Sequence, residues 1–199
     1  MTDDSEPRQD GSQAPAFELR PARPDDALCL AVLAQQVYLD TYATQGIRPA
    51  IARDVHAQFS QAAFDALMQR DDVQLEVAER LGHLIGFAQT HDGACHALAP
   101  AGPSAELVRL YVQEPFTAQG VGTALLHSAE KQAAARGHVL LWLTPWIHNH
   151  RTLAYYARRG YADLGATDHI IEGERHGNRV FAKQIVAAPS SGLTPRAAP

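Results

Sequence analysis

Two glycines separated by one residue, Gly120 and Gly122, lie where a β-prone run is followed by a helical one. The first N–H groups of a helix have no partner within it, and with the helix dipole they attract anions. Glycine also lets a phosphate approach the backbone closely. The spacing therefore predicts a helix start that binds a phosphate group, with pyrophosphate the natural guest. A tight turn without a ligand is the open alternative.

Two known nucleotide-binding motifs do not fit this junction. A Walker-type loop needs a lysine in the pattern GxxxxGK[ST], and none follows Gly122. A dinucleotide-binding fingerprint needs a third small residue, but Leu125 stands there. It also needs an acidic residue at the end of the next strand, and the apolar run 139–144 has none.

A second group of candidate residues lies further along the chain, in the predicted helix 149–159. Tyr155 and Tyr156 are adjacent there, and Asn149 stands at its start. Aromatic residues of an amphipathic helix usually belong to the core, and an asparagine in that place is a common N-cap. From these residues alone, both a structural and a functional role stay open.

Composition excludes several classes of protein. The 199 residues include 17 Lys and Arg against 22 Asp and Glu, a net charge of −5, which argues against nucleic acid or an anionic membrane as partner. Neither Cys29 nor Cys95 belongs to a CxxC pair, and His148 and His150 lack further ligands at metal-binding spacing, so no metal site is expected. Without a signal-peptide pattern or a membrane-spanning run, a cytoplasmic location is expected.

Hydrophobic periodicity, caps and turn residues predict the elements that must position these residues. Strands are expected at 17–20, 73–80, 84–90, 106–112, 139–144, 161–171 and 179–185, with a turn-rich segment at 173–178. Helices are expected at 24–42, 60–69, 119–136 and 149–159. This order predicts a mixed α/β sheet with hairpins, in which 106–112, 119–136 and 139–144 form one crossover unit.

Several local features refine this prediction. The first helix is expected to be capped by Asp25 or its neighbour and to carry an apolar face of Leu28, Val32, Val37 and Leu39. Other boundaries are expected from an N-cap at Ser60, a hairpin turn at 81–83 and a C-terminal Gly137. One domain is predicted at 16–187, between disordered polar tails at 1–15 and 188–199.

Taken together, these segments resemble the GNAT acetyltransferase superfamily. Its pyrophosphate loop reads Q/R-x-x-G-x-G/A, and Gly120-x-Gly122 matches the last half. Its later helix reads N-x-x-A-x-x-F-Y-x-x-x-G-F/Y, which is similar to the run from Asn149 through Tyr156 to Gly160-Tyr161. The resemblance implies a central, twisted, mostly antiparallel sheet with helices on both faces. It also implies direct acetyl transfer from acetyl-CoA to an amine.

The resemblance further implies a role for individual residues. Tyr156 would donate a proton to the sulfur of the leaving thiolate, whereas Tyr155 is expected in the core. Glu106 would be the general base, acting through water, or bind the amine, and His91 is a second candidate. Residues implied to contact the cofactor are Leu110, Tyr111, Val112, Gln119, Gly120, Val121, Gly122, Thr123 and Asn149.

One departure from the family pattern concerns cofactor affinity. Thr117 stands where the loop usually begins with Arg or Gln, and Ala118 replaces a frequent glycine. The loop therefore loses a side-chain donor while keeping its backbone amides. Compensation is expected from Arg136, Arg151 or Arg158. A catalytically silent module that binds acyl-CoA is the corresponding alternative.

A narrower resemblance is to the PaiA-type branch, which is linked to polyamine acetylation. It rests on three segments, Tyr38–Tyr42, Glu106–Val112 and Trp146–Arg151. It implies a small-molecule amine as acceptor, with a polyamine as the specific expectation. N-acetylation of a protein or peptide is the second enzymatic alternative, and a homodimer is also left open.

Overall fold

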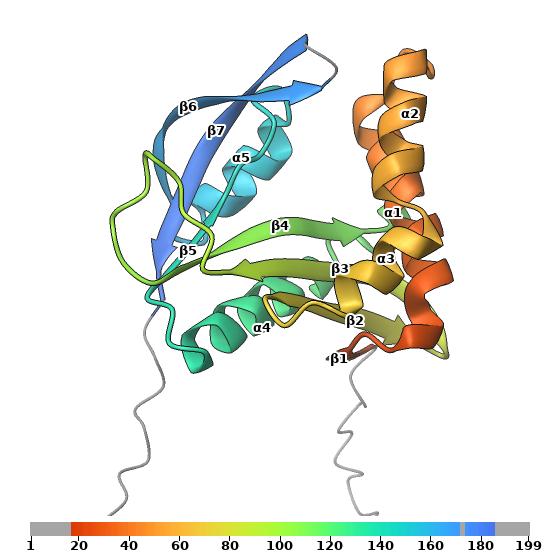
Figure 1. The fold of residues 1–199 in the computed structure, drawn as a ribbon, viewed down its shortest axis with the longest axis horizontal. Coiled ribbons are helices and arrows are strands. Elements are labelled where there is room, and N and C mark those ends of the chain that lie inside the picture. The colour runs from red at the N-terminus through yellow and green to blue at the C-terminus, as the bar shows by residue number, and fades with distance from the viewer. Residues whose placement is uncertain (1–16, 172–173, 186–199) are drawn as a thin grey trace, which may run out of the picture.

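The computed structural model describes residues 17–171 and 174–185, and Figure 1 shows their arrangement. Within them a seven-stranded sheet has the order β1-β2-β3-β4-β5-β7-β6. All neighbouring strands are antiparallel except β4 and β5, which are parallel. The strands are β1 (Glu18–Pro21), β2 (Val73–Arg80), β3 (His83–Asp92), β4 (Ser104–Val112), β5 (Leu140–Leu143), β6 (Ala162–Ile171) and β7 (Glu174–Gln184). The expected mixed, mostly antiparallel sheet is confirmed.

Helices cover both faces of the sheet (Figure 1). They are α1 (Ala27–Tyr42), α2 (Pro49–Gln58), α3 (Gln61–Met68), α4 (Val121–Ala135) and α5 (His150–Ala157), with 3₁₀ turns at Pro24–Asp26 and Glu114–Phe116. One core cluster joins α4 and the buried side of α5 to the sheet, including Leu125, Leu141 and Tyr156. Another joins α1, α2 and α3 to the opposite face, around Leu30, Phe64 and Phe87. The cavity described below lies between these helices at the end of β4.

Local signals in the sequence set several of the boundaries. The Ser60 side chain accepts a hydrogen bond from the Ala63 amide at 3.2 Å and so caps α3 as expected. Leu81 and Gly82 both have positive φ, the geometry of a tight β2–β3 hairpin turn. Gly137 follows the end of α4 with φ +90°, a backbone conformation that residues with side chains rarely adopt.

The predicted apolar face of α1 is wrong in part. Leu28 and Val32 are 57% and 58% exposed. The helix instead buries Leu30, Tyr38 and several alanines, whose small side chains let it pack closely on the sheet. The predicted cap is confirmed in part, because no side chain caps α1 itself but Asp26, the neighbour of Asp25, caps the 3₁₀ turn that precedes it. The Asp26 carboxylate binds Arg20, at 2.7 Å in the shorter contact, and accepts from the Arg23 amide.

Two further boundaries differ from the prediction. Residues 49–58 form a helix that is not among those expected from the sequence, although Pro49 at the first helical position is typical of a helix start. Residues 174–178, expected in a turn, begin β7 and pair with 167–171, because the hairpin ladder continues into this polar segment. The predicted tails, and the ends of the predicted domain at residues 16 and 186–187, lie outside the described residues.

Candidate active site

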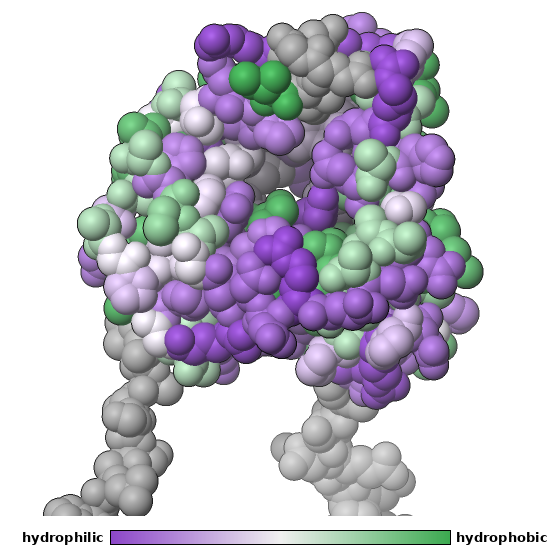
Figure 2. Space-filling view, viewed as in Figure 1, coloured by the Kyte–Doolittle hydropathy of each residue, from purple (hydrophilic) through white to green (hydrophobic). Residues whose placement is uncertain are grey.

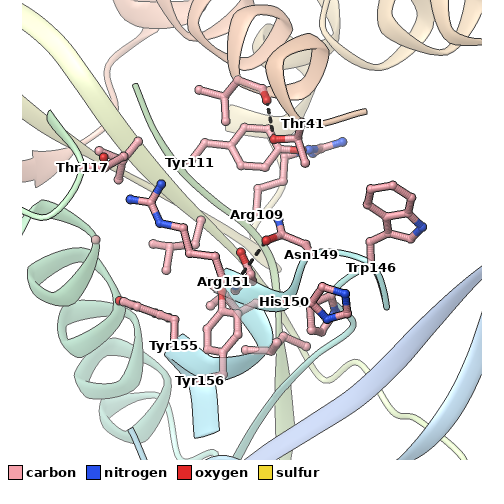
Figure 3. A pocket seen from close by; sticks show the side chains of 18 of the residues that line it. Thr41, Arg109, Tyr111, Thr117, Trp146, Asn149, His150, Arg151, Tyr155 and Tyr156 are labelled. Carbon is pink, nitrogen blue, oxygen red and sulfur yellow. Dashed lines mark hydrogen bonds between the residues drawn. The ribbon is translucent and has the colours of Figure 1, made fainter. Parts of the chain in front are cut away.

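A cavity of about 1130 Å³ opens between the end of α1, the outer half of β4 and the start of α5. Figure 2 shows the hollow between the two sides of the molecule, and Figure 3 shows its lining from close by. Its two ends are named here by their main feature. The glycine end comprises residues 117–123 with the facing part of α5, and the arginine end comprises Arg109, Tyr42, Trp146 and His148.

The cavity exists because β4 and β5 separate. Only three residues of β4, Ser104 to Glu106, pair with β5. From Leu107 to Val112 the strand pairs with β3 on one side and lines the cavity along its length. A strand with an unpaired side has N–H and C=O groups ready to bind another extended chain.

A bulge in β4 decides which side chains face which layer. Thr90 pairs with Leu107 and Gln89 with Arg109, so Val108 is the extra residue. Ala105 and Leu107 lie in the α4 core cluster, and beyond the bulge Leu110 and Val112 pack against that cluster. Arg109 and Tyr111 therefore point to the face covered by α1, α2 and α3.

Backbone geometry shapes the glycine end. Gly120 stands at the N-cap of α4 with φ +87°, and no side chain caps the helix there. The Ala124 amide donates to the Gly120 carbonyl at 2.9 Å, so the amides of Val121, Gly122 and Thr123 precede the first intrahelical bond. The sequence expectation of free amides at this helix start agrees with this geometry.

The candidate arginines occupy different places. Arg136 binds Asp92 and the Asp71 carbonyl at the far end of α4, so its expected compensation for Thr117 is wrong. Arg151 and Arg158 both line the cavity. In Figure 3 the Arg151 side chain extends toward Thr117, and its contact with the exposed Glu114 is long, at 3.5 Å.

Tyr155 and Tyr156 face different surroundings. Tyr155 reaches the first turn of α4, where an added Cβ on Gly122 would stand 3.6 Å from its hydroxyl oxygen. The Arg159 guanidinium lies over the Tyr155 ring, 3.6 Å from its centre, and also donates to the Thr123 hydroxyl. Tyr156 is only 6% exposed, yet it lines the cavity. Burial raises the pKa of the Tyr156 phenol well above its usual value, which keeps it protonated at neutral pH.

Asn149 has a defined structural role. Its side-chain oxygen accepts a hydrogen bond from the Thr152 amide at 3.1 Å, which caps α5. The residue also lines the cavity, beside Arg109 and Arg151 in Figure 3. The capping role is therefore confirmed, and a second role toward a ligand is compatible with its position.

The structure does not bring all predicted site residues to the cavity. Leu110, Tyr111, Val112, Gly120, Gly122, Thr123, Asn149 and Tyr156 line it, whereas Glu106, Gln119 and Val121 do not. Val121 is buried under the helix start, and the Gln119 side chain donates to the Pro115 carbonyl at 2.7 Å. Glu106 lies one residue before the lining part of β4, opposite His91 on β3. Burial raises the pKa of Glu106 and lowers that of His91.

At the arginine end, Arg109 is held by residues far away in the sequence. Its guanidinium donates to the side-chain oxygens of Gln89 on β3 and Gln58 on α2, the latter at 2.7 Å. Rings complete this end, since Tyr42 and Trp146 lie 5.5 Å apart and Trp146 and His148 5.0 Å apart. No site role was expected for these residues from the sequence. The alternation of side chains along β4 could have placed Arg109 at the cavity, but only if the bulge at Val108 were known.

Metal and membrane features can be stated for residues 17–171 and 174–185. No cluster of three or more His, Cys, Asp or Glu side chains suited to a metal ion occurs among them. None of their helices combines the length and apolar character needed to cross a membrane.

Comparison with known families decides what kind of site this is. The sequence profile of the Acetyltransferase (GNAT) family matches residues 42–161, which contain nearly the whole lining of the cavity. The chain belongs to the GNAT family. The resemblance to this family found in the sequence is therefore confirmed.

Individual relatives are more distant. A protein described as an uncharacterized N-acetyltransferase of Methanocaldococcus jannaschii is 28% identical over 102 residues, 50% of this chain and 44% of its own. An IAA acetyltransferase of Azospirillum brasilense is 29% identical over 100 residues, 49% of this chain and 60% of its own. The matched segment thus spans about half the length of these two relatives.

Solved structures show the same fold. The PaiA N-acetyltransferase of Thermoplasma acidophilum, crystallised with coenzyme A, superposes with a TM-score of 0.66. The match covers 84% of this chain and 98% of that one, at 22% sequence identity. At this identity the likeness establishes the GNAT fold of the described residues and leaves the substrate open.

Proposed function

We propose that the protein is an acetyl-CoA-dependent N-acetyltransferase that acts on the primary amine of a small molecule. One observation carries the proposal. A single cavity adjoins an unpaired length of β4, an uncapped helix start with Gly120 at positive φ, and the buried hydroxyl-bearing Tyr156. These three parts suit an extended chain, a phosphate group and a proton donor respectively.

The lining fits the shape and charge of acetyl-CoA. The unpaired side of Leu110, Tyr111 and Val112 can pair with an extended amide chain such as pantetheine. The amides from Gln119 to Thr123 can hold the pyrophosphate, because a helix start favours negative charge. Gly122 lies beside Tyr155 and Val112, where an added Cβ would make ordinary contacts at 3.6 and 3.7 Å.

Cationic side chains at the glycine end support the same assignment. Arg151 and Arg158 both line the cavity, and Arg151 is on the Thr117 side. We assign to these two arginines the charge that an arginine at position 117 would supply. Their long side chains are exposed, so each should contribute modestly to affinity compared with the backbone amides.

Acetyl-CoA supplies an acetyl group activated as a thioester, with a thiol as leaving group. The protein must hold a proton for the departing sulfur and remove one from the attacking amine. Tyr156 can do the first, because its ring lines the cavity and a phenol hydroxyl is protonated at neutral pH. Asn149 can hold the cofactor arm while it caps α5.

Removal of the amine proton is assigned to Glu106, acting through water. Its carboxyl group is outside the cavity lining but on the strand that leads into it. Burial raises its pKa, which brings the carboxylate closer to the basicity that a general base needs near neutral pH. Its cross-strand neighbour His91 hydrogen-bonds the Gln89 side chain at 2.8 Å and is the second candidate.

An acceptor panel tests the proposal. The protein would be incubated with acetyl-CoA and with amino acids, polyamines, aminoglycosides or short peptides, while release of free thiol is followed. Acetylated product, identified by mass spectrometry for at least one small amine, is the expected result. Transfer to peptides alone would replace the small-molecule acceptor by a protein or peptide. Binding of acetyl-CoA without transfer to any amine would indicate a silent acyl-CoA-binding module.

A further inference from the structure

The arginine end contains a cation whose charge the protein itself does not directly neutralise. Arg109 lines the cavity, and no carboxylate of the described residues forms an ion pair with it. Its hydrogen-bond partners Gln89 and Gln58 are neutral amides. An arginine stays charged in proteins, and a partly buried charge is unfavourable unless it is paired.

The negative groups nearby are already engaged or offset. Asp54 accepts hydrogen bonds from the Tyr38 hydroxyl at 2.6 Å and from the Gln58 amide at 2.5 Å, so Gln58 stands between it and Arg109. Glu106 lies on the same strand, beyond the bulge, and is outside the cavity lining. Burial lowers the pKa of Arg109 and outweighs the Tyr111 hydroxyl and the two carboxylates, which raise it. The guanidinium therefore lacks a close counter-charge.

The hydrogen bonds of Arg109 hold it in a fixed orientation. Gln89 comes from β3 and Gln58 from α2, and the Phe59 ring lies 4.9 Å from the guanidinium carbon. A guanidinium has five N–H donors in a planar fork, and these two bonds use one donor on each terminal nitrogen. The remaining donors suit a carboxylate, which a planar fork binds in two-point geometry.

Arg109 shares the cavity with the proposed proton donor, so a carboxylate bound to Arg109 can position an acceptor. In Figure 3 Arg109 lies between Tyr111 and Asn149, and the same cavity continues to Tyr156. The side chain is on the α1–α3 face of β4, opposite the face that packs on α4. A carboxylate held there would belong to the acceptor and would fix its amine relative to the acyl group.

We propose that Arg109 binds a carboxylate of the acceptor, so that the preferred acceptors are amines that also carry a carboxylate, such as amino acids. This inference rests on the proposed N-acetyltransferase function and narrows its substrate class. Tyr42 and Trp146 form the neighbouring wall, against which the remainder of such a molecule would lie. A polyamine has no group for Arg109 and would place a cation beside a cation.

Matched pairs of acceptors test the proposal. Each pair is an amino acid and the amine left by removing its carboxylate, for example phenylalanine with phenethylamine. The wild type should favour the carboxylate-bearing member by about 10- to 100-fold in kcat/KM, chiefly through KM, the size expected of a charge-assisted hydrogen-bond pair. In Arg109→Met the preference should fall to about twofold or less, with CoA affinity by calorimetry unchanged.

A control and a conservative variant keep the test decisive. Arg151→Met removes another cavity arginine, at the glycine end, and should change the rates for both members of a pair by the same factor. Arg109→Lys keeps the charge but loses the planar fork, so the preference for the carboxylate-bearing acceptor should fall by at least about threefold. This variant decides the test if Arg109→Met does not fold.

The outcomes separate this inference from the proposed function. Acetyl transfer without preference for the carboxylate-bearing member, or a preference that persists undiminished in both Arg109 variants, would overturn the role of Arg109 alone. Absence of transfer to every amine would instead refute the proposed enzymatic function itself.

Discussion

The two ends of the cavity are built in different ways. At the glycine end the candidate binding groups are backbone amides of a helix start that has Gly120 at its N-cap and no side-chain cap. At the arginine end they are side chains, with Arg109 held by Gln89 and Gln58 from two other elements. A backbone site is damaged by adding atoms, whereas a side-chain site is damaged by removing them. Under the proposed function, the glycine end would hold the acyl donor and the arginine end the acceptor.

Gly120→Glu should have the largest effect. The substitution puts a side chain at φ +87° and a carboxylate at the helix start, where an anion would bind. Acetyl-CoA affinity measured by calorimetry should fall by at least about 100-fold, more than 2.7 kcal/mol.

Gly137→Glu is the matched control, because it imposes the same strain at φ +90° at the other end of α4. It should lower the melting temperature but leave acetyl-CoA affinity within about twofold. Retained affinity in the Gly120 variant would place the cofactor elsewhere.

Tyr156→Phe should have the next largest effect, on rate alone. Removing the phenolic proton donor should lower kcat by tenfold or more, toward the roughly 100-fold typical of general acid catalysis, with acetyl-CoA affinity nearly unchanged. Tyr161→Phe provides the comparison, because its hydroxyl is bound to Glu130 at 3.0 Å, away from the cavity. If kcat of the Tyr156 variant equals that of the wild type, Tyr156 is not the acid.

Glu106→Gln should change the pH dependence. A base with a raised pKa places the acid limb of kcat/KM above pH 4.5, the ordinary value for this carboxyl group. The variant should lose that limb and about tenfold in rate near neutral pH, less than for a base in direct contact with the amine. A pH–rate profile that keeps the limb would move the role to His91.

The same substitution has a predictable effect on stability. Because the folded-state pKa of Glu106 is raised, the folded protein holds the proton more tightly than the unfolded chain. The stability from this group is fully present below about pH 4.5 and is lost as pH rises through the folded pKa. Relative to the wild type, Glu106→Gln should therefore gain stability as the pH rises from 4 to 8, as denaturant titrations can measure.

Asn149→Ala should have the smallest effect. Loss of the α5 cap should cost about 1 kcal/mol, a fall of roughly 2–4 °C in melting temperature. Asn149→Ser keeps a capping oxygen and should recover most of this loss. If Asn149 also contacts the cofactor, both variants bind acetyl-CoA more weakly than the wild type. Equal affinity in all three proteins would leave only the capping role.

The two ends also differ in how far the sequence predicted them. Gly120, Gly122, Ser60 and Gly137 each have a local backbone function that residue type and spacing indicate. The glycine end and most element boundaries were therefore predictable. Arg109 depends on the bulge at Val108 and on Gln58, which is 51 residues away. No local pattern specifies such a contact, so its place at the cavity emerges only from the fold.

The buried face of α1 was likewise not predictable from a local pattern. Leu28 and Val32 are large and apolar, but tertiary packing selects the alanine-rich face because it approaches the sheet more closely. The predicted domain limits, cytoplasmic location and homodimer stay predictions, since they concern residues or assemblies beyond those described.

Calorimetric titration of acetyl-CoA into the wild-type protein tests the proposal that this cavity is an acyl-donor site. This proposal predicts saturable binding of one molecule per chain, with a dissociation constant in the range common for enzyme substrates, about 1 μM to 1 mM. It also predicts that the binding is lost in Gly120→Glu and kept in Gly137→Glu. Absence of binding to the wild type, or equal binding to all three proteins, would contradict it.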